Sequence, residues 1–337
     1  MKPRLGLVSF WKQYDRKTYL RAVKLADKLG YDSFWGAEAW GYDITTLLAE
    51  MAVHTKRIKL ATGILNVYSR SPALIAMQAA TLQEISDGRF MLGMGTSGKN
   101  VIEGLHGVKF SKPLTQTKRV IRTVRTLHAG ERLDAEALGQ PMLRPFKLET
   151  TYPVDPQVPI YIAALKQKSI TNIGAMADGW MPIFWPHDQL HVGRAWVDEG
   201  ARSAGRDPKE IATAPFTTVI PLPGKQATKQ AAELIAFYVG GMGVYYRELL
   251  SNFGYKDVCD EIADRYQDPK HRKEAYKAVT PELIHALTIA GDPIYCRREL
   301  RRRLDAGMDA ALINLPPGRS WPELAAFIVA LAPNRWF

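Results

Sequence analysis

The sequence is poor in cysteine and has no long run of apolar residues. Cys259 and Cys296 are the two cysteines among 337 residues, and their separation argues against a disulfide scaffold or a cysteine-rich metal site. The apolar stretch Leu5 to Trp11 is broken by Lys12, which leaves it too short for a signal peptide or a membrane span. We therefore expect a soluble cytoplasmic protein that has no membrane partner.

The sequence also has fewer acidic than basic residues. The chain has 34 Asp and Glu against 45 Lys and Arg, a net charge of +11 and a pI near 9.5. A basic excess raises the local concentration of anionic ligands. The most basic stretches, Lys109–Arg125 and Arg297–Arg303, carry apolar residues at helical spacing, which is typical of solvated outer helix faces. Because no recognition helix or stacking platform accompanies them, we do not expect a nucleic-acid partner.

The remaining composition is that of a globular protein, with 46% hydrophobic and 23% charged residues. Short apolar runs alternate with longer helical patterns. Strands are predicted at Arg4–Ser9, Tyr31–Gly36, Arg57–Thr62, Arg89–Met94, Pro159–Ala163, Gly179–Phe184, Ala214–Pro221 and Ala310–Leu315. Helices are predicted at Lys17–Leu29, Ile44–His54, Pro72–Ile85, Pro113–Ala129 and Pro293–Ala306. Eight strands with helices between them favour a (β/α)8 TIM barrel formed by a single domain over residues 1–337.

Two long segments interrupt this alternation. Residues 133–158 are loop-like and contain prolines, and residues 226–290 are mostly of helical pattern. We interpret both as insertions on the barrel, the second as a helical insertion late in the chain. In such barrels the chemistry lies at the carboxyl ends of the strands, which is where candidate residues are sought.

The segment Gly93–Gly98 reads G-x-G-x-x-G after a predicted strand, as in dinucleotide-binding folds. Those folds also place an acidic residue about 20 positions further on, where this chain has Lys112–Gln116. A dinucleotide fold is therefore not favoured. The glycines still allow backbone N–H groups to approach a phosphate or the polar edge of a ring.

Two further groups of residues have two interpretations each. His187 and His191 have the spacing of zinc peptidase ligands, but Asp188 replaces the glutamate base and no third ligand is evident, so no metal is predicted. Glu38 and Trp40 stand at the end of the second strand. In one interpretation Glu38 is a carboxylate paired with an internal arginine and Trp40 is a packing residue. In the other interpretation both contact a flat heteroaromatic ligand.

Motifs in chain order carry a family resemblance. They are Phe34–Asp43, Thr62–Ile64, Tyr68–Pro72, Ala80–Leu82, Ser86–Gly95, Glu103–Gly107, Lys112–Pro113, Ile162–Ala164, Ala177–Trp180, Tyr238–Gly243, Ile289–Asp292 and Asp305–Asp309. With them the chain resembles the bacterial-luciferase-like (LLM class) flavin and deazaflavin oxidoreductases. Within that class it is most similar to the coenzyme F420-dependent branch that includes methylenetetrahydromethanopterin reductase.

The resemblance implies a homodimer of TIM barrels that holds its cofactor at the carboxyl face. It implies a non-prolyl cis peptide in a bulge at Gly63–Ile64. By resemblance Glu38 and Trp40 are the catalytic residues. The cofactor-binding residues that it implies are Gly63, Ile64, Asn66, Thr96, Ser97, Gly98, Ala163, Ala164, Lys166 and Lys168.

The chain also departs from its relatives. Lys166 and Gln167 replace the glycine and proline of the phosphate loop, Lys99 replaces a frequent proline, and Ala39 and Gly98 replace a histidine and a glutamate of other branches. The resulting hypothesis is hydride transfer between coenzyme F420 and a small organic substrate. Its alternatives are an FMN-dependent luciferase-like monooxygenase and a non-catalytic protein that binds flavin or deazaflavin.

Overall fold

The computed structural model describes residues 4–9, 14–135, 141, 144–150, 154, 157–242 and 244–336. Much of the predicted insertion 133–158 lies outside these residues. The strands are β1 (Leu5–Ser9), β2 (Ser33–Gly36), β3 (Lys59–Thr62), β4 (Leu65–Asn66), β5 (Phe90–Gly95), β6 (Ile160–Ile162), β7 (Gly179–Trp180), β8 (Ala212–Thr213), β9 (Phe216–Pro221), β10 (Thr288–Gly291) and β11 (Ala311–Asn314).

All strand pairs among the described residues are parallel. The sheet order is β10-β9-β11-β1-β2-β3-β5-β6-β7-β8, with β4 paired to β5. From β1 to β8 the neighbours follow the chain order, which is not the strand order of a dinucleotide-binding fold. The prediction that the chain does not form a dinucleotide-binding fold is therefore confirmed.

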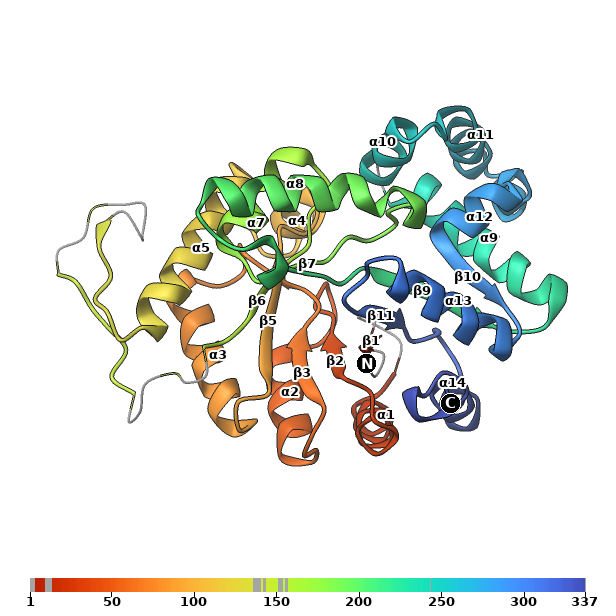
Figure 1. Cartoon of the computed structure of the whole chain (residues 1–337). Coiled ribbons are helices and arrows are strands. Elements are labelled where there is room, and N and C mark those ends of the chain that lie inside the picture. Colours follow the sequence, from red (N-terminus) through yellow and green to blue (C-terminus); the bar gives the residue numbers. More distant parts are fainter. Residues whose placement is uncertain are drawn as a thin grey trace.

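The sheet curls so that its ends meet along residues 212–221. On one side of this segment, the N–H groups of Ala214 and Phe216 donate to the carbonyls of Trp180 and Pro182. On the other side, the carbonyl of Pro215 accepts from the Leu312 N–H group. Figure 1 shows the curled sheet wrapped by helices, so the predicted parallel architecture is confirmed.

Helices surround the sheet. They are α1 (Arg16–Leu29), α2 (Ile44–Val53), α3 (Pro72–Ile85), α4 (Lys99–Gly104), α5 (Pro113–His128), α7 (Gln167–Met176), α8 (Leu190–Ser203), α9 (Gly224–Gly241), α10 (Val244–Asn252), α11 (Lys256–Gln267), α12 (Pro281–Leu287), α13 (Pro293–Asp305) and α14 (Trp321–Ala330). The five helices predicted from the sequence, α1, α2, α3, α5 and α13, begin within one residue of their expected starts. For example, α1 begins where the Asp15 carboxylate accepts from the Thr18 N–H group and ends at Gly30, whose φ of 81° suits glycine. Pro72, Pro113 and Pro293 each stand in the first turn of a helix, as predicted.

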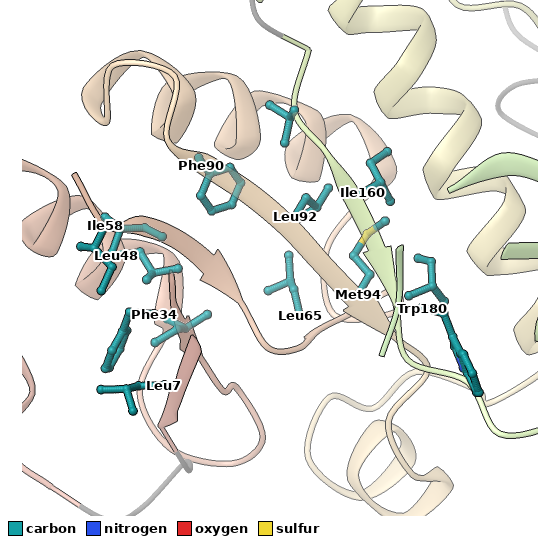
Figure 2. Close-up of a cluster of buried hydrophobic side chains, with 14 of the residues drawn as sticks. Leu7, Phe34, Leu48, Ile58, Leu65, Phe90, Leu92, Met94, Ile160 and Trp180 are labelled. Atoms are coloured by element: carbon teal, nitrogen blue, oxygen red, sulfur yellow. The ribbon is translucent and has the colours of Figure 1, made fainter. Parts of the chain in front are cut away.

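Two hydrophobic layers follow from the alternation of side chains along the strands. Leu7 and Phe34 belong to the outer layer between the strands and the helices, part of which Figure 2 shows. Their neighbours Val8 and Trp35 belong to the inner layer. The buried members of the inner layer are Val8, Trp35, Ala61, Met91, Tyr161, Met181, Ala214, Ala310 and Leu312. Because most strands of the sheet contribute to this one cluster, the sheet encloses a filled interior.

Helices α9 to α12 occupy most of the predicted helical segment 226–290 and share a separate core that includes Tyr238, Leu250, Ile262 and Leu283. Two observations differ from the prediction. The segment ends in a strand, β10, and the predicted strand 214–221 is preceded by the short strand β8. In the described part of the chain, no helix combines the length and apolar character that crossing a membrane requires.

Candidate active site

Glu38 follows β2 and lies in an ion-pair network at the carboxyl ends of the strands. Its two carboxylate oxygens accept from the Arg70 guanidinium at 2.6 and 2.9 Å, and one also accepts from the Ile44 N–H group at 3.2 Å. The side chains of Glu38 and Arg70 are 9% and 11% exposed. Arg70 also pairs with Asp43, the residue that caps α2. The structure thus has the arrangement that one interpretation anticipated, a carboxylate paired with an internal arginine.

The network favours the charged forms of Arg70 and Asp43. Burial opposes the charged form of Arg70, but hydrogen bonds and charges from Glu38 and Asp43 outweigh it and raise the pKa of Arg70. Burial likewise opposes the charged form of Asp43. The N–H group of Thr46, the hydroxyls of Thr45 and Thr46, and Arg70 outweigh it and lower the pKa of Asp43. All these interactions favour a fixed geometry at the end of β2.

The segment between β3 and β4 carries the expected cis peptide bond at Gly63–Ile64, so this prediction is confirmed. The N–H group of Glu38 donates to the Ile64 carbonyl at 3.4 Å, which joins the bulge to the end of β2. Asn66 is 2% exposed, and its side-chain oxygen accepts from the N–H groups of Tyr68 and Ser69. Asn66 therefore holds the turn that leads to Arg70.

Small residues line the sheet beside the bulge. A Cβ atom on Gly63 would lie 2.9 Å from the Trp35 Cβ atom, and one on Gly95 would lie 2.4 Å from the Ile64 side chain and 3.5 Å from the Ala163 Cβ atom. Gly63, Ile64, Gly95 and Ala163 thus form one close-packed surface at the end of the inner layer. Side chains larger than these would not fit there.

The glycine loop Thr96–Gly98 follows β5 and, unlike the close-packed residues beside the bulge, has open space around Gly98. Ser97 has a φ of 55°, and a Cβ atom on Gly98 would meet nothing within 4 Å. The N–H groups of Ser97 and Gly98 donate to no group among the described residues. Free donors beside open space fit the carbonyl edge or phosphate of a cofactor.

The remaining predicted residues surround the start of α7. The Ala164 carbonyl accepts from the Trp180 indole at 2.9 Å. Lys166 and Lys168 are exposed, and the Lys166 ammonium lies 3.9 Å from the Glu248 carboxylate and 5.8 Å from the centre of the Tyr245 ring. Lys166 therefore connects the α7 start to α10. Two surface lysines beside a helix N-terminus suit an anionic group.

Trp40 is 45% exposed, so it is not a core packing residue. It stands two residues after Glu38, at the outer edge of the site. An aromatic ring at this edge has the chemistry to pack against a flat heteroaromatic ring. Its catalytic role stays a prediction.

Sequence reasoning missed two features of the site. Arg70 was not singled out, although an arginine between a buried strand and a Ser-Pro helix start is a recognisable signal. The second feature is an aromatic group that α9 and α10 place beyond β7. The Phe184 ring stacks on Tyr238 at 4.2 Å and lies 5.6 Å from Tyr246. Burial raises the pKa of Tyr246 to about 12 and that of Tyr238 further, so both hydroxyls are neutral at pH 7.

Two other places in the structure lie outside this site. Ligand atoms of His187, His285 and Glu299 lie within 4.8 Å of one another, but Arg302 contacts both His187 and Glu299, and this positive charge disfavours a cation. A surface hollow of about 430 Å³ lies between α5 and α7. Arg125 in its lining contacts the carbonyl of Val158, before β6, so the hollow is near the amino ends of the strands.

Comparison with known proteins agrees with this geometry. A protein of Mycobacterium tuberculosis assigned to the coenzyme F420-dependent oxidoreductases is 29% identical over 96% of this chain and 99% of its own. The 5,10-methylenetetrahydromethanopterin reductase of Methanolobus tindarius is 29% identical over 88% of this chain and 89% of its own. The coenzyme F420-dependent tetrahydromethanopterin reductase of Methanopyrus kandleri has the same fold, with a TM-score of 0.78, 22% identity and 97% of each chain covered. The model of the luciferase-like monooxygenase family matches residues 6–310, and the chain belongs to that family.

Proposed function

We propose that this protein is an oxidoreductase that transfers hydride between coenzyme F420 and a small organic substrate. The observation that carries the proposal is the close-packed small-residue surface at the cis bulge, which adjoins free N–H donors at Ser97 and Gly98. A flat ring requires such a surface, and its polar edge requires such donors. The relatives named above add the identity of the coenzyme. The proposal includes a (β/α)8 barrel with a late helical insertion, and a homodimer.

The residues present fit a deazaflavin coenzyme. Gly63, Ile64 and Asn66 would support one face of the ring, and the loop Thr96–Gly98 would bind its polar edge. When bound, the coenzyme supplies the hydride chemistry, while the protein orients the reactants and excludes water. The exposed ammonium groups of Lys166 and Lys168 would meet phosphate and glutamyl carboxylates.

Glu38 acts in this proposal as a positioning residue. Its carboxylate accepts three hydrogen bonds from Arg70 and the Ile44 N–H group, so it joins the β2 end to Arg70 and to the start of α2, while its backbone N–H group donates to the Ile64 carbonyl of the bulge. Trp40 stands two residues further along the chain and is 45% exposed, and the proposal places it at the outer edge of the site. Replacement Glu38→Gln is expected to weaken coenzyme binding, and retained binding with lost turnover would instead place Glu38 in the chemistry.

An FMN-dependent monooxygenase is the second candidate, favoured by the name of the matching family model. The two candidates differ in a simple property. A reduced flavin reacts with oxygen during monooxygenation, whereas hydride transfer by a deazaflavin consumes none. Oxygen uptake therefore separates them once the bound cofactor is known.

The deciding experiment is a fluorescence titration of the purified protein with coenzyme F420 and, separately, with FMN. We expect a dissociation constant in the micromolar range or tighter for coenzyme F420 and weaker binding of FMN. The reverse preference would favour the monooxygenase. Binding of neither would contradict both proposals.

A matched pair of variants locates the site. A Cβ atom on Gly98 or on Gly104 would meet nothing within 4 Å, so leucine at either position is expected to leave stability unchanged. Gly98→Leu should weaken coenzyme binding at least tenfold because its side chain would occupy the space beside the free donors. Gly104→Leu, on the exposed end of α4, should bind like the parent protein.

A further inference from the structure

Two polar residues face the inner side of the sheet at the level where β11 ends. Asn314 is the last residue of β11 and is 8% exposed, and Thr218 of β9 is 7% exposed. The Asn314 Nδ2 group donates to the Thr218 hydroxyl oxygen at 3.3 Å. The Asn314 Oδ1 atom is buried and accepts from no group in the described part of the chain.

The alternation of side chains fixes where these groups point. Leu312 and Phe216, two residues before Asn314 and Thr218, belong to the inner layer or pack against it. Asn314 and Thr218 therefore face the same interior, one step closer to the carboxyl ends of the strands. Ile64, the second residue of the cis peptide, packs against this same inner layer. The polar pair and Ile64 of the proposed coenzyme surface thus adjoin the same inner layer.

A buried amide oxygen without a partner is uncommon and costs free energy, so such a group in a folded protein calls for an explanation. Packing gives none here, because the preceding inner positions are the apolar residues Ala310, just before β11, and Leu312 within it. A β-branched apolar residue would satisfy the strand without leaving an acceptor free.

We infer that Asn314, held by Thr218, is a substrate-binding residue whose Oδ1 atom accepts a hydrogen bond from an O–H or N–H group of the substrate. This inference rests on the proposed function and narrows its substrate class to small molecules that carry such a donor next to the carbon that exchanges hydride. In this arrangement the substrate would lie between the pair and the coenzyme ring.

The first test is the stability of the protein without ligand, measured by urea unfolding. If Asn314 is kept for ligand binding, Asn314→Val removes an unsatisfied acceptor and should raise the urea midpoint. Thr218→Val should lower it, because the Asn314 amide then loses its partner. A lower midpoint for Asn314→Val would assign Asn314 a purely structural role and overturn the inference.

The second test uses two probes that differ in one donor. N-methylacetamide has an N–H group and N,N-dimethylacetamide has none, while both have the same carbonyl. In ¹⁵N-labelled protein, the side-chain amide signal of Asn314 is identified by its loss in Asn314→Val. We expect the first probe to shift this signal and, from the backbone amide shifts, to bind at least fivefold more tightly than the second. In Asn314→Val and Asn314→Ala, which lack the side-chain signal, the backbone amide shifts should show equal binding of the two probes. Equal effects of the two probes would overturn the inference.

Coenzyme binding separates this inference from the proposed function. Asn314→Val is expected to bind coenzyme F420 within twofold of the parent protein. A tenfold loss would mean that Asn314 contacts the coenzyme and would overturn the substrate assignment. Failure of the parent protein itself to bind coenzyme F420 would refute the proposed function, while the probe experiment would still report on Asn314.

Discussion

Replacing Arg70 with methionine would test how far the site depends on one ion pair. Glu38 and Arg70 are both about nine-tenths buried and are joined by two hydrogen bonds. Removal of one partner from a buried pair leaves an uncompensated charge and costs about 3–5 kcal/mol. Asp43 would lose the same partner, but its side chain is 41% exposed, so its loss adds at most about 1 kcal/mol. We expect Arg70→Met to lower the free energy of unfolding by about 3–5 kcal/mol.

The assay is urea unfolding at pH 7 of the parent protein, Arg70→Met, Glu38→Gln and the double variant. Glu38→Gln removes the charge and retains the shape of the side chain, so the double variant should be less destabilised than the sum of the single ones. The expected non-additivity lies between about 0.5 and 3 kcal/mol. A cost below about 1 kcal/mol for Arg70→Met, with additive effects, would refute a buried and coupled ion pair.

Three further predictions concern residues outside this pair. Hydrogen bonds and charges from Arg302 and Arg303 outweigh burial and lower the pKa of Glu299 to about 2, so Glu299 stabilises the fold above its ordinary pKa and less as pH falls towards 2. Glu299→Gln should therefore cost on the order of 3 kcal/mol at pH 7, and acid titration of both proteins should show the difference vanish near pH 2. Gly93→Ala should cost several kcal/mol or prevent folding, since its Cβ atom would lie 2.0 Å from the Thr62 carbonyl oxygen, and thermal unfolding would measure this. Asp27→Ala should cost about 2–3 kcal/mol in urea unfolding, because its carboxylate accepts from three successive N–H groups at residues 56–58; an unchanged midpoint would contradict that role.

The sequence predicts well those parts of the fold that local rules determine. Apolar runs of four to six residues locate the long strands, and a proline in the first turn locates helices such as α3 and α13. The cis peptide at Gly63–Ile64 came from the family resemblance, because nothing in two such residues signals an isomer by itself. Glu38 and Ser97 could be placed at the carboxyl ends of strands because they closely follow strands that the sequence locates.

Features that depend on distant partners could not be read from the chain. β10 is a four-residue strand directly after a helix, too short for a period to be distinguished, and only its pairing with β9 defines it. Arg70 becomes significant through Glu38, which is 32 residues away. In the sequence, Asn314 is simply a polar residue at the end of a predicted strand. Only the packing around it shows that its buried Oδ1 atom accepts from no described group.

The pairing of β10 with β9 has a consequence for how such a protein can diversify. The chain leaves β9 at Pro221, forms helices α9 to α12, and returns to the same strand in parallel register, with Thr288 opposite Thr218. The helical segment thus begins at the carboxyl end of β9 and ends at the amino end of β10, the strand beside it. A different helical segment could be exchanged between the same two anchor points while the glycine surface stays intact, which would separate the evolution of substrate range from that of coenzyme binding.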